Sequence, residues 1–253
     1  DFQGLMKSAI FARLSHSQKC VGLAGISLRE PLAALLYSHR VSPKGTHIIE
    51  INLSLVETLG AQPSNWEFPL PDRPQERKAV QTQLQQLGTK DFIVVNPGGG
   101  WKSKRWAPEN YVKLIGALNS KIPLDILVTG SPQEEEVARE ILTRANVARA
   151  KWFPSTLLQF IALAREAKLL VGGDTGPLHL AAAVGTPIVA LFDATDPRNT
   201  PERNGPFNPG DIILCGLRRA KPTGHSKHLN YLEGVSVDSV ANATLQRLGI
   251  ENG

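Results

Sequence analysis

Short apolar runs alternate with helical segments in the second part of the chain, from about residue 91 to the end. The runs predict β-strands at Phe92–Val95, Leu124–Thr129, Ala148–Phe153, Lys168–Val171 and Pro187–Phe192. The segments between and after them predict helices at Pro108–Asn119, Pro132–Thr143, Thr156–Ala164, Pro177–Val184 and Val237–Leu248, the last capped by Ser236 and closed by Gly249. Strands that alternate with helices in this way indicate a parallel sheet covered on both faces, which is an α/β, Rossmann-like domain.

The first 61 residues have a different pattern and predict part of a second domain. They indicate a helix over 4–15, a strand around 20–23 and helical segments over 30–38 and 47–59. About one strand cannot form a sheet with two covered faces, so we expect the front of this N-terminal domain to be missing from a truncated chain.

A proline-rich stretch separates the two parts. Residues 62–74 contain four prolines, which exclude a continuous helix or a central strand. The expected organisation is therefore the remainder of an N-terminal domain over 1–61, a linker over 62–74 and a C-terminal Rossmann-like domain over 75–253.

The composition indicates a folded protein. Of the 253 residues, 42% are hydrophobic and 20% are charged, which allows a buried core and excludes a wholly disordered chain. No apolar run approaches the ~20 residues that span a bilayer, and the first residues lack a signal-peptide pattern. Two distant cysteines, Cys20 and Cys215, favour a reducing compartment, so we expect a cytoplasmic protein.

The net charge of +5 is spread over the chain, but one basic cluster stands out. It consists of Arg218, Arg219, Lys221, His225, Lys227 and His228. We interpret it as a solvated surface, and the functional alternative is contact with an anionic substrate or membrane surface. Nucleic acid is disfavoured as a partner, because aromatic residues make up only 6% and do not interleave with the basic ones.

Three loops that follow predicted strands carry the candidate chemistry, because ligands of such sheets bind at the carboxyl ends of the strands. The first loop, residues 96–106, reads NPGGGWKSKRW. Its glycines let backbone N–H groups approach a ligand, and three cations follow, which suits a phosphate or diphosphate. A turn with solvated charges is the alternative. Trp101 replaces the glycine before Lys-Ser, so this is no Walker loop.

The second loop, residues 172–179, reads GGDTGPLH and leads from a strand into a helix. The unpaired N–H groups and the dipole of that helix predict an anion site. Asp174 either caps the helix or binds ligand hydroxyls. For His179 the default interpretation is a core histidine, and a ligand role is the alternative.

The third loop, residues 130–136, contains Glu134, which either binds ribose hydroxyls or stabilises the positive end of a helix. The histidines are scattered and neither cysteine has a CxxC partner, so we expect no metal site. GxSxG and GxGxxG motifs are absent. The three loops together indicate a domain that binds a phosphorylated, hydroxyl-rich ligand such as a nucleotide sugar.

At these residues the sequence resembles the heptosyltransferase family of GT-B glycosyltransferases, which build the inner core of lipopolysaccharide. The most specific match is GGDTGPLHLAAAVGTPIVALF with Thr195-Asp196-Pro197 after it. PGGGWKSKRWAPENY resembles the family's phosphate loop, and DFQGLMKSA and LREPLAALLYSHR resemble acceptor-side segments of its heptosyltransferase I members. The resemblance implies a GT-B fold of two Rossmann-like domains, with the N-terminal one incomplete in this chain.

The resemblance also implies roles for individual residues. The donor, ADP-heptose, would be bound by Gly99, Gly100, Lys104, Glu134, Ser155, Thr156, Asp174, Thr175, Gly176 and His179. Among them, Lys104 would neutralise the leaving diphosphate, Glu134 would bind the ribose and Asp174 the sugar hydroxyls. Lys7 and Arg29 would face the anionic acceptor, Kdo-lipid A.

Chemistry in this family inverts the anomeric centre without a metal or a cofactor. An acceptor hydroxyl, deprotonated by an Asp, displaces the nucleoside diphosphate. That Asp belongs to a Gly-Asp segment near the family's N-terminus, which this sequence does not contain, so we name no catalytic base and expect the chain alone to be inactive. The chain also departs from many relatives at Gly99-Gly100, where they carry hydroxyl side chains, and at Asp193, where glycine is common.

The leading interpretation is a heptosyltransferase fragment that holds the whole donor-binding half. Two alternatives stay open: a GT-B transferase that uses another nucleotide sugar, since the Asp-Thr-Gly loop does not read the base, and a non-catalytic nucleotide-binding module. The expected location is cytoplasmic, with peripheral contact at the inner face of the inner membrane.

Overall fold

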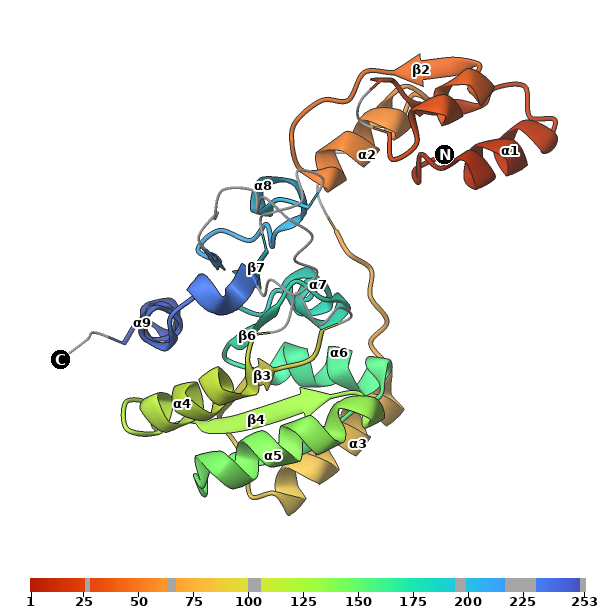
Figure 1. The fold of residues 1–253 in the computed structure, drawn as a ribbon. Helices are drawn as coiled ribbons and strands as arrows, with labels where there is room; N and C mark the ends of the chain where they lie inside the picture. The colour runs from red at the N-terminus through yellow and green to blue at the C-terminus, as the bar shows by residue number, and fades with distance from the viewer. Residues whose placement is uncertain (26–27, 63–66, 100–105, 194–198, 217–230, 251–253) are drawn as a thin grey trace. The chain divides into compact units, whose positions relative to one another are not determined.

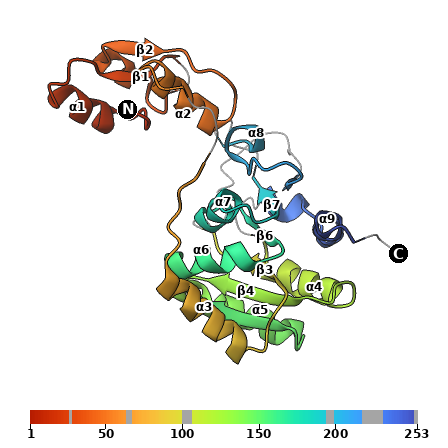
Figure 2. The same cartoon turned by 180° about the vertical axis from the view of Figure 1, so that it is seen from behind.

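A computed structural model (Figures 1 and 2) describes residues 1–25, 28–62, 67–99, 106–193, 199–216 and 231–250. The chain divides into two compact units. The first comprises Asp1–Glu67 with Glu202–Asn204, and the second comprises Phe68–Pro201 with Gly205–Gly253. Within the described residues, no helix is both long enough and apolar enough to cross a membrane.

The first unit combines a two-stranded parallel sheet with short helices. Its elements before residue 60 are α1 (Met6–Leu14), β1 (Val21–Leu23), the 3-10 helix η2 (Pro31–Leu36), β2 (His39–Val41) and α2 (Ile48–Glu57). Their buried side chains form a small apolar core, which includes Tyr37. The Tyr37 ring lies against Gly22, where any side chain would collide with it, and the hydroxyl donates to Asp1 Oδ2 at 2.8 Å.

The prediction of about one strand in this region was wrong, because β2 pairs with β1. The reason is local. The three residues of β2 are exposed or only partly buried, so they show neither an apolar run nor a clear alternation. The segment predicted as helical over 30–38 is a 3-10 helix that ends at Leu36, just before this strand.

In the described part of the second unit, six parallel strands form one sheet in the order β5-β4-β3-β6-β7-β8. They are β3 (Phe92–Asn96), β4 (Asp125–Gly130), β5 (Ala150–Pro154), β6 (Leu170–Gly173), β7 (Ile188–Phe192) and β8 (Ile212–Cys215). The chain runs outward from β3 to β5 and then returns to the other side of β3 with β6. The strand order therefore reverses between β3 and β6, and such a reversal is where open α/β sheets bind ligands.

Helices cover both faces of this sheet, as the sequence predicts. They are α3 (Pro74–Gln86), α4 (Pro108–Asn119), η4 (Pro132–Glu134), α5 (Glu135–Ala145), α6 (Leu157–Glu166), α7 (Gly176–Ala183), η5 (Tyr231–Gly234) and α9 (Val237–Leu248), while α8 (Pro201–Asn204) begins at the unit boundary. One apolar core lies between the sheet and α4, α5 and α9, and a second lies between the sheet and α3, α6 and α7 (Figure 1).

The five predicted strands of this unit are confirmed within two residues at each end. The apolar runs of β3, β4, β6 and β7 are buried or nearly so, whereas the edge strand β5 buries only Phe153. Ser236 Oγ accepts from Ser239 N at 3.1 Å and Gly249 closes α9 in the left-handed region, as predicted. The sequence analysis missed α3 and β8. In α3 only Val80 and Leu84 are buried, so its apolar pattern is weak.

Candidate nucleotide-sugar site

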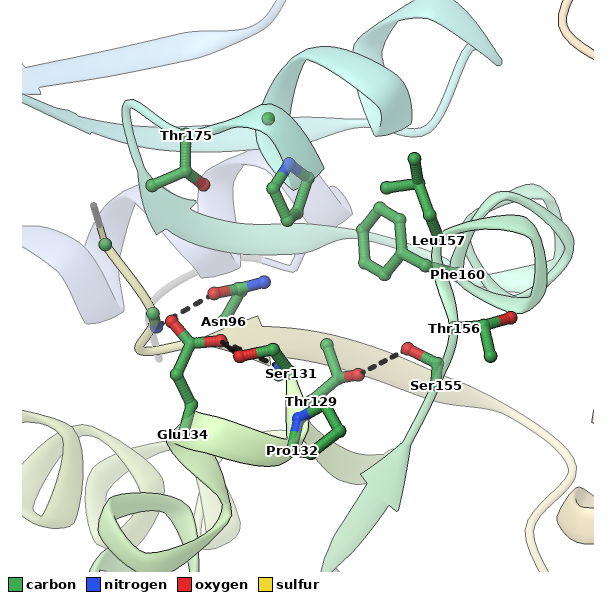
Figure 3. A pocket seen from close by; sticks show the side chains of 15 residues that line it. Asn96, Thr129, Ser131, Pro132, Glu134, Ser155, Thr156, Leu157, Phe160 and Thr175 are labelled. Atoms are coloured by element: carbon green, nitrogen blue, oxygen red, sulfur yellow. Dashed lines mark hydrogen bonds between the residues drawn. The ribbon is translucent and has the colours of Figure 1, made fainter.

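A cavity of about 440 Å³ opens at the carboxyl ends of β5, β4, β3 and β6, around the point where the strand order reverses (Figure 3). Its lining residues come from the ends of these strands and the segments that follow them: Asn96, Gly98 and Gly99 at the end of β3; Thr129, Gly130, Ser131, Pro132 and Glu134 at the end of β4; Ser155, Thr156, Leu157 and Phe160 after β5; and Thr175, Gly176 and Pro177 after β6. All three loops that the sequence singled out therefore meet in one cavity.

The loop after β3 brings backbone close to the loop after β4. Asn96 Oδ1 accepts from Gly98 N at 2.9 Å and thereby fixes the first turn of the loop. A Cβ atom at Gly98 would collide with Glu134 Oε1, so a side chain at this position would displace the Glu134 carboxylate from where it lies. Gly99 is buried and lines the cavity. Gly100 and Lys104, which the sequence also assigns to the donor site, lie outside the described residues.

Glu134 caps a helix and also lines the cavity. Its Oε2 accepts from Ser131 N and from Ser131 Oγ, both at 2.8 Å, in a capping box that opens η4. Its Oε1 accepts no hydrogen bond from the described residues and lies at the cavity wall (Figure 3). One carboxylate thus starts a helix with one oxygen and leaves the other, which can accept hydrogen bonds, at the cavity wall.

The loop after β5 presents hydroxyls next to an apolar wall. Thr156 caps α6, because its Oγ1 accepts from Gln159 N at 3.3 Å. Ser155 Oγ lies 3.2 Å from Thr129 Oγ1 on the neighbouring strand. The side chains of Leu157 and Phe160 line the cavity beside them (Figure 3), and Leu157 is 62% exposed.

The loop after β6 provides a helix N-terminus. Thr175 is the N-cap of α7 but its side chain makes no capping hydrogen bond, and the helix begins at Gly176. The first-turn N–H groups at Gly176 and Leu178 therefore rely on other partners, and the positive end of the helix dipole favours an anion there. This geometry agrees with the predicted anion site.

Asp174 and His179 lie beside the cavity rather than among its lining residues, and they contact each other. His179 Nε2 lies 3.0 Å from Asp174 Oδ1, and Asn199 Nδ2 donates to Asp174 Oδ2 at 2.7 Å. The default interpretation of His179 as a core histidine was wrong, because its side chain is 44% exposed. The Asp174 side chain is 10% exposed, and the helix cap is Thr175, one residue later.

Lys7 and Arg29, the predicted acceptor-side cations, belong to the first unit. Both are exposed, and they lie on segments that hydrogen bonds join: Glu30 N donates to Gly4 O at 3.0 Å, and Met6 N donates to Glu30 Oε2 at 2.6 Å. Their contact with an acceptor stays a prediction.

The structure adds cavity residues that the sequence analysis did not single out, among them Asn96, Thr129, Leu157 and Phe160. Asn96 and Thr129 end or nearly end their strands, a position that could have identified them. Asn199 gave no signal, because only folding places it beside Asp174. Among the residues that the structure describes, no three His, Cys, Asp or Glu side chains gather in a way that could hold a metal ion.

Comparison of the sequence with protein families gives a match over residues 1–231 to glycosyltransferase family 9 (heptosyltransferase). Lipopolysaccharide heptosyltransferase 1 of Escherichia coli K12 is 31% identical over 204 residues, which cover 78% of this chain and 60% of that protein. Lipopolysaccharide heptosyltransferase 3 of the same strain is 32% identical over 168 residues, 63% of this chain and 48% of that protein. The chain thus spans about half to three fifths of the length of these curated relatives.

Solved structures with the same fold include E. coli heptosyltransferase WaaC with ADP, with a TM-score of 0.71 and 24% identity over 98% of this chain and 71% of that one. E. coli ADP-heptose lipopolysaccharide heptosyltransferase II gives a TM-score of 0.70 and 20% identity, over 97% of this chain and 74% of that one. The predicted α/β fold class, with its parallel sheet, is confirmed.

Proposed function

The chain belongs to glycosyltransferase family 9, the heptosyltransferase family, as its motifs predict, and from this premise we propose that it binds ADP-L-glycero-D-manno-heptose for transfer of the heptose to the lipopolysaccharide inner core. The finer parts of this proposal are the adenine nucleotide, Kdo-lipid A as the acceptor, inversion at the anomeric carbon and independence from metal ions. Peripheral contact with the inner membrane belongs to the same proposal.

One observation carries the proposal: a single cavity follows the ends of four neighbouring strands, with a different set of polar groups at each end. The cavity extends over the ends of β5, β4, β3 and β6, which are neighbours in the sheet. Adjacent strands lie about 4.8 Å apart, so the cavity follows a line of roughly 14 Å. We assign the base to the β5 end, the ribose to the β4 end and the diphosphate to the β3 and β6 ends.

The ribose assignment is supported by Glu134, whose Oε1 can accept hydrogen bonds from two vicinal hydroxyls. The diphosphate assignment is supported by the two loops that lack bulky side chains. Gly98 and Gly99 lie on one side and the N-terminus of α7, from Gly176, lies on the other. Gly98 N already donates to Asn96 Oδ1, so we assign the phosphate contacts to the N–H groups and the dipole at the start of α7, which stabilise phosphate oxygens more strongly as charge grows on a leaving diphosphate.

The heptose then extends past β6 toward Asp174. A carboxylate that is nearly buried and held by Asn199 and His179 has a fixed direction, which suits recognition of sugar hydroxyls. In the proposed transfer, an acceptor oxygen forms a bond to the anomeric carbon while the bond from that carbon to the diphosphate breaks. ADP leaves with the electron pair, and the hydroxyl proton passes to a base that we leave unassigned.

Calorimetry on the whole chain in EDTA tests the proposal. We expect ADP and ADP-heptose to bind in the micromolar-to-millimolar range, with ADP-heptose several-fold tighter than ADP and both tighter than UDP and UDP-glucose. A preference for the uridine ligands would favour a transferase that uses another nucleotide sugar. Loss of ADP binding in EDTA would contradict metal independence, and equal affinity for ADP and ADP-heptose would contradict recognition of the sugar.

A further inference from the structure

Two hydroxyl groups at the β5 end of the cavity form a hydrogen-bond chain with a defined direction. Thr129 is fully buried, and its Oγ1 donates to Phe153 O at 2.8 Å. A carbonyl oxygen can only accept, so the single hydrogen of the Thr129 hydroxyl is committed to Phe153.

This commitment fixes the second contact. Ser155 Oγ lies 3.2 Å from Thr129 Oγ1, and one of the two must donate. Figure 3 marks this contact with a dashed line. Because the Thr129 hydrogen is already used, we assign the donor role in it to Ser155. The Ser155 oxygen then has lone pairs to offer to the cavity but no hydrogen, so it acts as an acceptor only.

The surroundings of Ser155 suit a nucleobase. Leu157 and Phe160 line the cavity beside it and supply apolar surface on which a flat ring can pack. Pro132 lines the same cavity from the loop after β4. A base that lies on this surface turns one polar edge toward the acceptor that Ser155 provides.

We propose that the Thr129–Ser155 pair selects the base by hydrogen-bond polarity, and that it favours a purine with an exocyclic amino group over one with a carbonyl at the same position. Adenine carries an N–H donor there, whereas hypoxanthine carries an oxygen that would face the lone pairs of Ser155. This inference rests on the proposed function, since it assumes that a nucleoside diphosphate occupies the cavity. The inference concerns the base of the donor, which the Asp-Thr-Gly loop does not recognise.

The test compares ADP with inosine diphosphate, because the bases differ only in the 6-amino group and the matching carbonyl with its ring proton. We expect the whole chain to bind ADP about 10-fold to 100-fold more tightly, the range for a polar group left facing an unsuitable partner. Inorganic pyrophosphate, which lacks a base, serves as the reference ligand. Equal affinity for ADP and inosine diphosphate would overturn the inference and leave the proposed function intact.

Three variants locate the preference. Thr129→Val removes the acceptor for the Ser155 hydrogen and frees that hydroxyl to donate. The affinities of this variant for ADP and for inosine diphosphate should therefore differ by no more than about threefold. Thr129→Ser keeps the hydroxyl and should keep the wild-type ratio of the two affinities. Ser155→Ala alters a partly exposed side chain with little risk to folding, and it should also abolish the preference while pyrophosphate binding stays unchanged.

The remaining outcomes are equally decisive. A Ser155→Ala protein that keeps the wild-type ratio would show that another group reads the base, and the inference would fail. Failure of every nucleoside diphosphate to bind the wild-type chain would contradict the proposed function itself, and the inference would fall with it.

Discussion

The two edges of the parallel sheet in the second unit use similar polar side chains with opposite results. At the amino edge, before β3 and at the starts of β4 and β5, Lys151 Nζ donates to Leu87 O and Thr89 Oγ1 at 2.9 Å and to Asp125 Oδ2 at 2.7 Å. All three ammonium hydrogens are therefore used within the protein. This cluster joins three segments and has no donor left for a ligand.

At the carboxyl edge the polar side chains are only partly satisfied by the protein. Glu134 uses one oxygen for Ser131 and keeps the other, and Ser155 donates its hydrogen but keeps its lone pairs. Neither burial nor residue type separates the two edges, since charged groups occur at both. Between the Lys151 cluster and the cavity side chains, what differs is the hydrogen-bonding capacity that remains after folding: Lys151 uses its donors within the protein, whereas Glu134 and Ser155 keep acceptor sites at the cavity.

The largest effect is expected at the amino edge. Lys151→Met leaves the Asp125 carboxylate, whose side chain is 15% exposed, without its counter-charge. We expect the free energy of unfolding to fall by about 3 kcal/mol, while ADP affinity stays within about twofold. Urea unfolding and calorimetry measure the two quantities.

Arg139→Met is the matched control for that variant. Arg139 pairs with Glu135 on the exposed face of α5, and loss of such a pair costs about 0.5 kcal/mol or less. A Lys151→Met protein that kept its stability but lost ADP affinity would reverse the assignment of the two edges.

The next effect concerns the sugar end of the site. Asp174→Asn should weaken ADP-heptose binding about tenfold, near 1.4 kcal/mol, and leave ADP binding almost unchanged, because the carboxylate is assigned to the sugar alone. Calorimetry with both ligands gives the ratio. Equal losses for the two ligands, or a lowered melting temperature, would show instead that Asp174 supports the fold.

Asn199→Ala sharpens this prediction, because it removes the donor to Asp174 Oδ2 but keeps the carboxylate. We expect a smaller loss of about threefold, again confined to ADP-heptose. An affinity for ADP-heptose that does not change would mean that the orientation of Asp174 does not depend on Asn199.

Glu134→Gln tests the division of one carboxylate between helix and ligand. The amide keeps only one acceptor oxygen, so it can either cap η4 or bind the ribose. We expect about a threefold to fivefold loss of ADP affinity, near 1 kcal/mol, measured by calorimetry. Glu136, two residues further along the chain, is exposed and serves as the control. Glu136→Gln should change neither ADP affinity nor stability.

The smallest effect is a pH dependence at the amino edge. Asp211 accepts from Ile188 N at 3.0 Å and from Arg247 at 3.2 Å, and burial raises its pKa above the ordinary 3.8 despite these contacts. A carboxyl group with a raised folded pKa stabilises the fold below 3.8, and this contribution is lost as pH rises through the folded pKa. Relative to Asp211→Asn, the wild type should therefore lose stability as the pH rises from 3.8. A difference between the two proteins that is constant or grows with pH would contradict this assignment.

The sequence predicted the elements that have a clear local signal, which is an apolar run, a helical pattern or a cap. The strands β3, β4, β6 and β7 appear as apolar runs because both of their faces are covered, and the helix caps at Ser236 and Gly249 act locally. It did not predict α3, a polar helix with two buried apolar residues, or β2, a strand without an apolar run. Local pattern fails where an element depends on its neighbours.

In the site, too, residues within motifs could be predicted, whereas residues whose roles depend on distant neighbours could not. Motifs and a family resemblance pointed to Glu134, Ser155 and Thr175, which all line the cavity. Thr129 could not be assigned a role, because its importance comes from the direction of its hydrogen bond to the neighbouring strand. Asn199 is 25 residues from Asp174 in sequence, and no local pattern connects them.

The close approach of Gly98 to Glu134 also constrains how this protein and its relatives can change over evolution. A mutation that adds a side chain at position 98 displaces the Glu134 carboxylate, unless the residue at position 134 is shortened as well. The reverse order is open, since a shorter residue at 134 leaves room at 98. The two positions are therefore expected to covary, with loss of the glutamate preceding loss of the glycine.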